Sequence, residues 1–407
     1  MEKNSLKSYL QSPSAIRERC GQILKIAQNG KLLHFDYHPE HLKSTVDYIV
    51  STILENYPDL EIPYHSRWRH FDAGNFPRMS WIENDLKNAD KLERGRILFE
   101  LVISSVLLDA GAGREWTYHE SKTQQPFARS EGLAVASFHM YFSGLFSADT
   151  KNHMRADGGA MQDLSSEKLA EGLQASPGNP LEGLAGRAGL IKKLGRAVLS
   201  NPEIFTGSRL GGLFDFMIRH ANKKKISALF IFDTVLNSFA SIWPGRVNLG
   251  NTNLGDCWPH PLLRSGEKGS ELIPFHKLSQ WLSYSLVEPL ENYGLTIEDI
   301  DQLTGLAEYR NGGLFLDCQL LQLKNPDEAE QSHEAGSPLI VEWRALTIAL
   351  LDLIAHEIRK ALDLDQKRFP LVKILEGGTW SAGRKIAREL RDDGSPPITL
   401  ISDGTVF

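Results

Sequence analysis

Residues 337–358, SPLIVEWRALTIALLDLIAHEI, are the stretch of the chain with the clearest periodicity. Ser337 followed by Pro338 is typical of an N-cap and the first position of a helix. Apolar side chains then recur at steps of three and four residues, which places them on one face of a long helix. They are Trp343, Leu346, Leu350, Leu353, Ile354 and Ile358. The stretch therefore predicts a long helix that buries one face in a core.

The same periodicity marks helices along most of the chain. A second helix is predicted from about Pro274 to Glu288, where Pro289 ends or kinks it. Its apolar stripe consists of Phe275, Leu278, Leu282 and Leu286. Further helices are predicted at Ser14–Gln28, Leu42–Glu55, Lys91–Leu108, Glu131–Phe146, Leu190–Leu199, Gly212–His220, Ile226–Phe239 and Trp380–Arg391. Helices are therefore expected to dominate the fold.

Strand signals are sparse. Residues 314–323 alternate weakly, and Asp403-Gly404, between 399–402 and 405–407, is typical of a tight hairpin turn. A βαβ alternation is missing, which disfavours Rossmann and TIM-barrel folds. The prediction is a mainly α, multi-helix globular fold with small β-hairpin additions. It is expected to be a single large domain over residues 1–407, with the Gly- and Pro-rich stretch 176–189 as either a surface loop or a joint between two lobes.

The composition is that of an ordinary globular protein. The chain has 407 residues, of which 41% are hydrophobic and 24% charged, and its formal net charge is −6. The densest basic run is only Lys223–Lys225, so nucleic acid is not an expected partner. The three cysteines lie far apart, which argues against a disulfide-stapled secreted domain. The polar start and short apolar runs predict a cytoplasmic protein that binds no membrane.

Metal and nucleotide motifs are weak or missing. His34, His38 and His41, with Asp36 nearby, have the spacing of metal ligands, but Pro39 interrupts a helix there. Histidines around a surface turn are the favoured interpretation, so no metal and no cofactor is predicted. The sequence contains no GxxxxGK[ST], GxSxG, HExxH or GxGxxG motif, which disfavours a nucleotide-phosphate loop of known type.

The segment HSRWRHF, residues 65–71, is a candidate ligand-binding site. The guanidinium groups of Arg67 and Arg69 suit phosphates and carboxylates, and the face of Trp68 suits a sugar or a base. A structural alternative is an arginine–aromatic stack that holds a loop. The residue types alone do not separate the two interpretations.

The segment LGDCWPH, residues 254–260, places a carboxylate and an indole in one turn. Loops on a rigid scaffold often carry function, so Asp256 and Trp258 are candidate site residues. The structural alternative is a turn capped by Asp256, with Trp258 packed into the core.

The segment EYRNGG, residues 308–313, combines charged side chains with paired glycines. Glycines allow the backbone to approach a ligand closely. Glu308 and Asp317 could act as a carboxylate pair, with Tyr309 and Arg310 beside the ligand. A structural ion pair between Glu308 and Arg310 is the alternative.

The segment EGGTWSAGR, residues 376–384, is predicted to begin a helix. Free backbone N–H groups at Gly377, Gly378 and Thr379 would attract an anion, and Arg384 would add positive charge. Simple capping of the helix by Thr379 is the alternative.

Eight segments in a fixed order resemble a family associated with the URC-type pathway of uracil catabolism. They are residues 65–74 (HSRWRHFDAG), 109–118 (DAGAGREWTY), 129–137 (RSEGLAVAS), 254–258 (LGDCW), 274–293 (PFHKLSQWLSYSLVEPLENY), 303–313 (LTGLAEYRNGG), 342–352 (EWRALTIALLD) and 376–384 (EGGTWSAGR). Together they span nearly the whole chain. The resemblance implies a place in uracil degradation, alongside a GTP-cyclohydrolase-like protein and uracil phosphoribosyltransferase.

A shorter block resembles a second family. Glu308-Tyr309-Arg310 is similar to the Asp-Tyr-Arg block of queuosine-salvage nucleosidases, which are helical enzymes that cleave a ribosyl C1′–N bond. The chain has Glu where that family has Asp. The resemblance implies a carboxylate role for Glu308.

The leading functional hypothesis is a ribosyl-N hydrolase. Opening of the uracil ring should leave a ribosylurea-type compound, with or without a 5′-phosphate, whose N-glycosidic bond must break to release urea. The transition state would resemble an oxocarbenium ion, which a buried carboxylate stabilises. Glu308 or Asp317 is expected in that role, with Asp256 in reserve. The expected substrate-binding residues are Trp68, Trp258, Tyr309, Arg310, Arg67, Arg69, Gly377, Gly378, Thr379 and Arg384.

Two other hypotheses stay open at this stage. An amidohydrolase acting on a ureido C–N bond usually needs a metal-bound water or an activated nucleophile. Its ligands would have to come from His34, His38, His65, His70 and His260, if the fold brings them together. A non-catalytic protein that binds a metabolite or another protein of the pathway is the third hypothesis. The sequence does not fix the oligomeric state.

Overall fold

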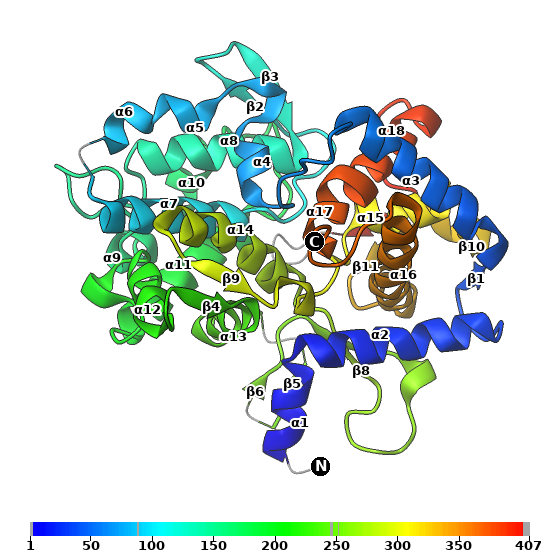
Figure 1. The fold of residues 1–407 in the computed structure, drawn as a ribbon. Helices are drawn as coiled ribbons and strands as arrows, with labels where there is room; N and C mark the ends of the chain where they lie inside the picture. Colours follow the sequence, from blue (N-terminus) through cyan, green and yellow to red (C-terminus); the bar gives the residue numbers. More distant parts are fainter. Residues whose placement is uncertain (1–2, 88, 245–246, 251, 402–407) are drawn as a thin grey trace. The chain divides into compact units, whose positions relative to one another are not determined.

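The computed structural model describes residues 3–87, 89–244, 247–250 and 252–401 (Figure 1). Helices dominate and the strands form only two-stranded sheets, which confirms the mainly α prediction. By packing, the described chain divides into two units. The first contains residues 3–65, 247–280 and 300–401, and the second contains residues 66–244 and 281–299.

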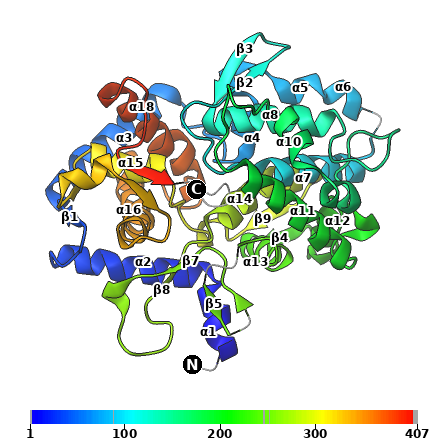
Figure 2. The same cartoon turned by 180° about the vertical axis from the view of Figure 1, so that it is seen from behind.

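The first unit joins the beginning and the end of the chain. In Figures 1 and 2 the blue helices α2 and α3 lie beside the orange helix α16, and α3 also contacts the red helix α18. The helical elements of this unit are α1 Lys3–Leu10, α2 Pro13–Gln28, η1 Pro39–His41, α3 Leu42–Asn56, η4 Pro261–Leu263, the start of α14 Lys277–Tyr293, η5 Ile300–Gln302, α15 Tyr309–Asp317, η6 Pro326–Glu330, α16 Pro338–Leu362, α17 Leu371–Lys373, η7 Ile374–Trp380 and α18 Ser381–Leu390.

Helix α16 is the long helix that the opening stretch predicts. Ser337 caps it through a side-chain oxygen that accepts from the Ile340 N–H, and Pro338 is its first residue. Its C-cap, Asp363, adopts a left-handed conformation with φ of 53°. Most of its side chains are buried, because α2, α3 and α15 all pack against it. The helix therefore forms the centre of the first unit.

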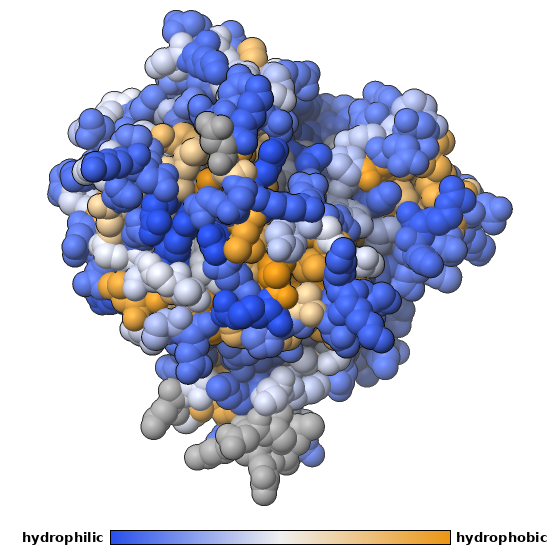
Figure 3. Space-filling view, turned by 60° about the vertical axis from the view of Figure 1, so that its left-hand side comes forward, coloured by the Kyte–Doolittle hydropathy of each residue, from blue (hydrophilic) through white to orange (hydrophobic). Residues whose placement is uncertain are grey.

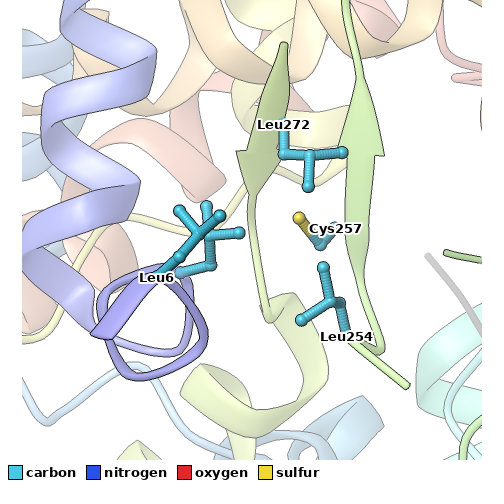
Figure 4. Packing of buried hydrophobic residues seen from close by; sticks show 5 residues of the cluster. Leu6, Leu254, Cys257 and Leu272 are labelled. Carbon is cyan, nitrogen blue, oxygen red and sulfur yellow. The ribbon is translucent and has the colours of Figure 1, made fainter. Parts of the chain in front are cut away.

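Three antiparallel pairs and one parallel pair of strands complete this unit. β1 Phe35–Tyr37 pairs with β10 Leu321–Leu323, β5 Asn248–Leu249 with β6 Thr252–Asn253, β7 Cys257–Pro259 with β8 Leu272–Pro274, and β11 Ser332–Glu334, in parallel, with β12 Thr399–Ile401. Figure 4 shows that Leu6 of α1 packs toward the β7–β8 pair. With Leu10, Leu254, Cys257 and Leu272 it forms a small buried cluster.

The second unit is built around α7 and α8, which contact each other. Its helical elements are α4 Arg67–Phe71, η2 Ala73–Asn75, α5 Arg78–Trp81, α6 Glu83–Leu86, α7 Lys91–Leu107, α8 Arg129–Phe142, α9 Gly158–Gln162, α10 Ser166–Gly172, α11 Leu184–Ser200, η3 Thr206–Ser208, α12 Gly212–His220, α13 Ala228–Ser238 and the remainder of α14. Its strands are the antiparallel pair β2 Thr117–Glu120 and β3 Gln125–Ala128, and the parallel pair β4 Lys225–Ser227 and β9 Thr296–Glu298.

A buried carboxylate ties several segments of the second unit together. Glu100, on α7, is fully buried and accepts hydrogen bonds from the guanidinium of Arg209 at 2.6 and 3.0 Å. It also accepts from the Tyr141 hydroxyl at 2.9 Å and from the backbone N–H groups of Gly211 and Ala156 at 2.9 and 3.2 Å. One side chain thus satisfies donors from three other parts of the unit.

The surface agrees with the composition. On the face shown in Figure 3 hydrophilic residues cover most of the area, and hydrophobic ones form separate patches between them. Large hydrophobic side chains that are exposed among the described residues are Leu33, Leu54, Leu199, Leu390 and Ile401. Within the described ranges, no helix is both long enough and apolar enough to cross a membrane.

Several boundaries differ from the sequence predictions. Helix α14 continues through Pro289 to Tyr293 instead of ending at Glu288. Residues 314–323 do not form one strand, because α15 extends to Asp317 and only Leu321–Leu323 form a strand, β10.

Other predictions concern the chain's last residues and its possible joint. Residues 399–401 pair in parallel with β11, and residues 402–407, which contain the predicted hairpin turn, lie outside the described residues. The stretch 176–189, for which the sequence left open a surface loop or a joint between two lobes, lies inside the second unit. It does not connect the two units.

Candidate active site

The carboxylate of Glu308 lies at the N-terminus of α15 in the first unit. It is the N-cap residue, and its two oxygens accept hydrogen bonds from the Arg310 N–H at 2.8 Å and the Asn311 N–H at 2.6 Å. Only 9% of the residue is exposed. Burial raises the pKa of Glu308, although these two N–H groups oppose the rise. The result is a buried carboxylate with a fixed orientation.

Two basic side chains of the same unit act on this carboxylate. The charges of Lys277, at the start of α14, and of His65 both act to lower the pKa of Glu308, against the dominant effect of burial. His65 is itself paired with Glu376, since its Nδ1 lies 2.6 Å from the Glu376 carboxylate. The indole of Trp380 lies against the imidazole, with 5.6 Å between ring centroids. We call Glu308, His65, Glu376 and Lys277 the carboxylate–histidine cluster.

Glu376 belongs to a segment of π-helix. α17, the π-helical η7 and α18 follow one another directly from Leu371 to Leu390. A π-helical turn is rare and often marks a functional site. Gly377 and Gly378 let this segment approach its neighbours, because a Cβ on either would lie 2.7 Å from Ile62 or 3.0 Å from Ile49.

The predicted anion site at this segment is wrong in its local structure. Gly377, Gly378 and Thr379 lie in the middle of a continuous helical stretch, so they are not at a helix N-terminus. The guanidinium of Arg384 lies over the ring of Trp380, 5.4 Å from its centroid. The glycines therefore allow the helix to pack closely against its neighbours. Arg384 lies beside the indole of Trp380, which contacts His65.

The carboxylate of Asp256 is the centre of a second set of hydrogen bonds in the first unit. Its two oxygens accept a bidentate pair of hydrogen bonds from Arg344, both at 2.7 Å. They also accept from the Trp258 indole at 2.7 Å and from the Lys277 backbone N–H at 3.0 Å. Although burial acts to raise its pKa, Arg344 holds the pKa of Asp256 well below its ordinary value. All four contacts stabilise the fold. We therefore assign Asp256 and Trp258 a structural role, in which Asp256 holds the backbone of Lys277 in position.

His260, in the same segment, gives the stability of the protein a dependence on pH. It is fully buried, and burial lowers its pKa from 6.5 to about 4. As the pH falls, the imidazole of the unfolded chain takes up a proton near pH 6.5. In the folded protein it does so only near pH 4. From pH 7 to pH 5 the free energy of unfolding should therefore fall by up to about 2 kcal/mol through this group. Urea unfolding of wild type and His260→Gln at both pH values checks this, and equal pH dependence in the two proteins would contradict it.

The other residues of the EYRNGG segment have separate partners. Arg310 does not pair with the side chain of Glu308, because its Nη1 donates to the Gly394 carbonyl at 2.7 Å and its guanidinium lies over the ring of Tyr309. Asp317, at the end of α15, accepts a bidentate pair from Arg391 at 2.8 and 2.6 Å. The structural ion pair of this region is thus Asp317–Arg391.

The three candidates of the HSRWRHF segment lie in the second unit. Arg67 is fully buried and bonds Ser105, Ser130 and, at 3.0 Å, Asp109. The Trp68 indole donates to the Ser285 carbonyl at 2.8 Å. Arg69 pairs with Glu288 at 2.6 Å. These contacts are hydrogen bonds and ion pairs within the unit and not the arginine–aromatic stack of the structural alternative. Because they already occupy these side chains, we leave Arg67, Trp68 and Arg69 out of the proposed site.

The histidine cluster near the N-terminus is held by carboxylates. His34 lies 3.1 Å from Glu328, and His38 lies 3.0 Å from Glu40. In the part of the chain that the structure describes, no group of three or more His, Cys, Asp or Glu side chains is arranged to hold a metal ion.

The sequence alone did not indicate that His65, Glu376 and Lys277 belong to an acid–base site. His65 and Glu376 begin two of the segments that the sequence singles out, which is a signal, but they lie 311 residues apart along the chain. Lys277 had no signal beyond its place in the segment 274–293. Only the fold shows that these side chains meet.

The fold and the cluster together define a mainly helical protein with a buried carboxylate–imidazole site. The chain belongs to the family described as "Protein of unknown function (DUF1688)", whose model matches residues 9–407. It is 38% identical, over 440 residues and 98% of both chains, to "Uracil catabolism protein 4" of Lachancea kluyveri. It is also 38% identical, over 400 residues and 96% of both chains, to "Protein urg3" of Schizosaccharomyces pombe. These comparisons confirm the family resemblance that the eight sequence segments indicate.

Proposed function

We propose that this protein acts in uracil catabolism and hydrolyses the N-glycosidic bond of a ribosylurea-type compound or another ribosyl-N compound. The pathway is supported by the name of the Lachancea relative, to which the chain is similar along its length. The reaction is supported by the Glu308 carboxylate, which is buried and is fixed by two backbone N–H groups. This carboxylate is the observation that carries the proposal.

The chemistry requires stabilisation of positive charge at the sugar. As the C1′–N bond lengthens, positive charge develops at C1′ and the ring oxygen. An oriented carboxylate in a site of low dielectric stabilises that charge without reorganising. The helix N-terminus and the two N–H groups favour the ionised form of Glu308, which is the form that the proposed reaction requires.

The histidine of the cluster suits the water that completes the reaction. A carboxylate that is bonded to one ring nitrogen fixes the orientation of an imidazole and stabilises its protonated form. His65 and Glu376 have this arrangement. In the proposed reaction the C1′–N bond breaks and the oxygen of the attacking water bonds to C1′. His65 accepts the proton of that water and then passes it to the departing urea nitrogen.

The direct test uses purified protein with ribosylurea and with its 5′-phosphate, followed by mass spectrometry. Hydrolysis at C1′ should yield urea together with ribose or ribose 5-phosphate. Release of ammonia from the ureido group with the sugar–nitrogen bond intact would replace the proposal by an amidohydrolase. Binding without turnover of either compound would replace it by a non-catalytic function.

A further inference from the structure

The carboxylate–histidine cluster is accompanied by a regular set of uncharged polar side chains. Three charged residues of the cluster are each followed, three positions further along the chain, by an uncharged polar residue. The pairs are Lys277 with Gln280, Glu308 with Asn311, and Glu376 with Thr379. Gln280, Asn311 and Thr379 are all completely buried.

Each of these three side chains has one polar atom for which the described part of the chain provides no hydrogen-bond partner. The atoms are Gln280 Nε2, Asn311 Oδ1 and Thr379 Oγ1. Gln280 Oε1 accepts from the Thr304 N–H at 3.4 Å, and Asn311 Nδ2 donates to the Leu306 carbonyl at 3.2 Å. These bonds fix which way each amide points, so the first leaves a free donor and the second a free acceptor.

The three side chains share one neighbourhood of the first unit. Gln280 and Asn311 bond to the same short segment, at residues 304 and 306, which leads into Glu308. Thr379 lies on η7, which packs against α15. A polar atom that is buried without a partner destabilises the folded state, and such atoms are rare in native proteins. Three of them beside one charged cluster therefore indicate a bound group that satisfies them.

We propose that Gln280, Asn311 and Thr379 form a subsite for a planar ureido or amide group. Gln280 Nε2 would donate to its carbonyl oxygen, Asn311 Oδ1 would accept from an N–H, and the Thr379 hydroxyl can do either. The inference rests on the proposed function, since it places the ureido group of the substrate beside the sugar carbon that Glu308 faces. A site whose buried polar groups need partners also rejects ligands that lack them.

The test measures binding with ligands that cannot be hydrolysed. One probe is the carbocyclic analogue of ribosylurea, in which a methylene replaces the ring oxygen so that no oxocarbenium ion can form. The other is the same carbocycle with a methoxy group in place of the urea. The variants are Gln280→Met and Thr379→Val, which keep the approximate shape of each side chain and remove the unpaired atom. Gln280→Met also removes Oε1, which accepts from the Thr304 N–H. Thr52→Val is the matched control, because Thr52 is a buried threonine whose hydroxyl already donates to the Tyr48 carbonyl.

The expected result has two parts. Calorimetry should show about tenfold weaker binding of the carbocyclic urea by Gln280→Met and by Thr379→Val, with unchanged binding of the methoxy compound. Without ligand Thr379→Val should melt at or above the wild-type temperature, because no described residue is a partner of the hydroxyl that it removes. Gln280→Met should melt slightly lower, because it also removes the acceptor of the Thr304 N–H. Thr52→Val should melt lower and bind both probes as wild type does.

The outcomes separate this proposal from the proposed function. Equal weakening of both probes, no weakening of either, or a wild type that binds neither probe would overturn the subsite. Should ribosylurea be hydrolysed while the variants bind the carbocyclic urea normally, hydrolysis stands and the subsite falls. Urea-dependent binding that the variants lose, without hydrolysis of ribosylurea, would leave the subsite standing and remove the N-glycosidase.

Discussion

The Glu308→Gln variant is expected to hydrolyse ribosylurea about 10²–10³ times more slowly than wild type, with a similar KM. Glutamine keeps the size of the side chain but removes the negative charge. That charge is useful mainly in the transition state, when C1′ becomes positive, so binding of the neutral substrate should change little. Steady-state kinetics at saturating substrate gives the comparison.

The N-cap role of Glu308 requires a control. Both carboxylate oxygens hold backbone N–H groups, so Gln should also cost about 1 kcal/mol of stability through the weakened cap. Ser at position 308 caps a helix well but places no carboxylate in the cluster. Glu308→Ser should therefore melt close to wild type and still lose turnover. Normal turnover per folded molecule in either variant would reduce Glu308 to a cap.

Replacing Glu100 by Leu in the second unit is expected to lower the free energy of unfolding by about 3–5 kcal/mol. The change removes the acceptor for the guanidinium of Arg209 and for the hydroxyl of Tyr141. It also leaves the N–H groups of Gly211 and Ala156 buried without that acceptor. Among the described residues, Arg209 then keeps only its ion pair with the partly buried Glu93, and several unpaired donors remain inside the folded unit. Urea unfolding followed by far-UV circular dichroism measures the loss.

An exposed ion pair provides the matched control for Glu100. Lys43 and Asp47 approach to 2.6 Å on α3, but both side chains are more than half exposed. Asp47→Asn should leave the unfolding transition almost unchanged, since water and counter-ions screen such a pair. An equally small effect of Glu100→Leu would mean that the unit rearranges and gives Arg209 other partners.

The sequence predicts the helices of this protein well because their signals are local. Helix α12 begins and ends at Gly212 and His220, as its periodicity predicts, and Ser337 caps α16 as expected. The errors occur where local signals compete with tertiary packing. Pro289 is tolerated inside α14, and the weakly alternating residues after 308 form α15 because that helix packs against α16 and α18.

The site was only partly predictable. Glu308 was identified from its own segment, since glycines and a charged block lie together there. The pairing of His65 with Glu376 joins the first and the last chain segment of the first unit. No rule of spacing in a single sequence reveals a contact between residues 311 positions apart. The same holds for Asp256, whose partner Arg344 could be recognised only after folding.

The π-helical segment η7 makes the exact number of residues in this part of the chain important. A π turn holds one residue more than an α turn of the same kind, so it resembles a helix that has absorbed a single-residue insertion. Deleting one residue between Ile374 and Trp380 would allow an ordinary α-helix to close without a break. Because the π turn has absorbed that residue, the helix after it would keep its orientation, and only the residues inside the turn would point in new directions. Glu376 and Thr379 lie inside this turn, so the extra residue sets the direction of these two side chains.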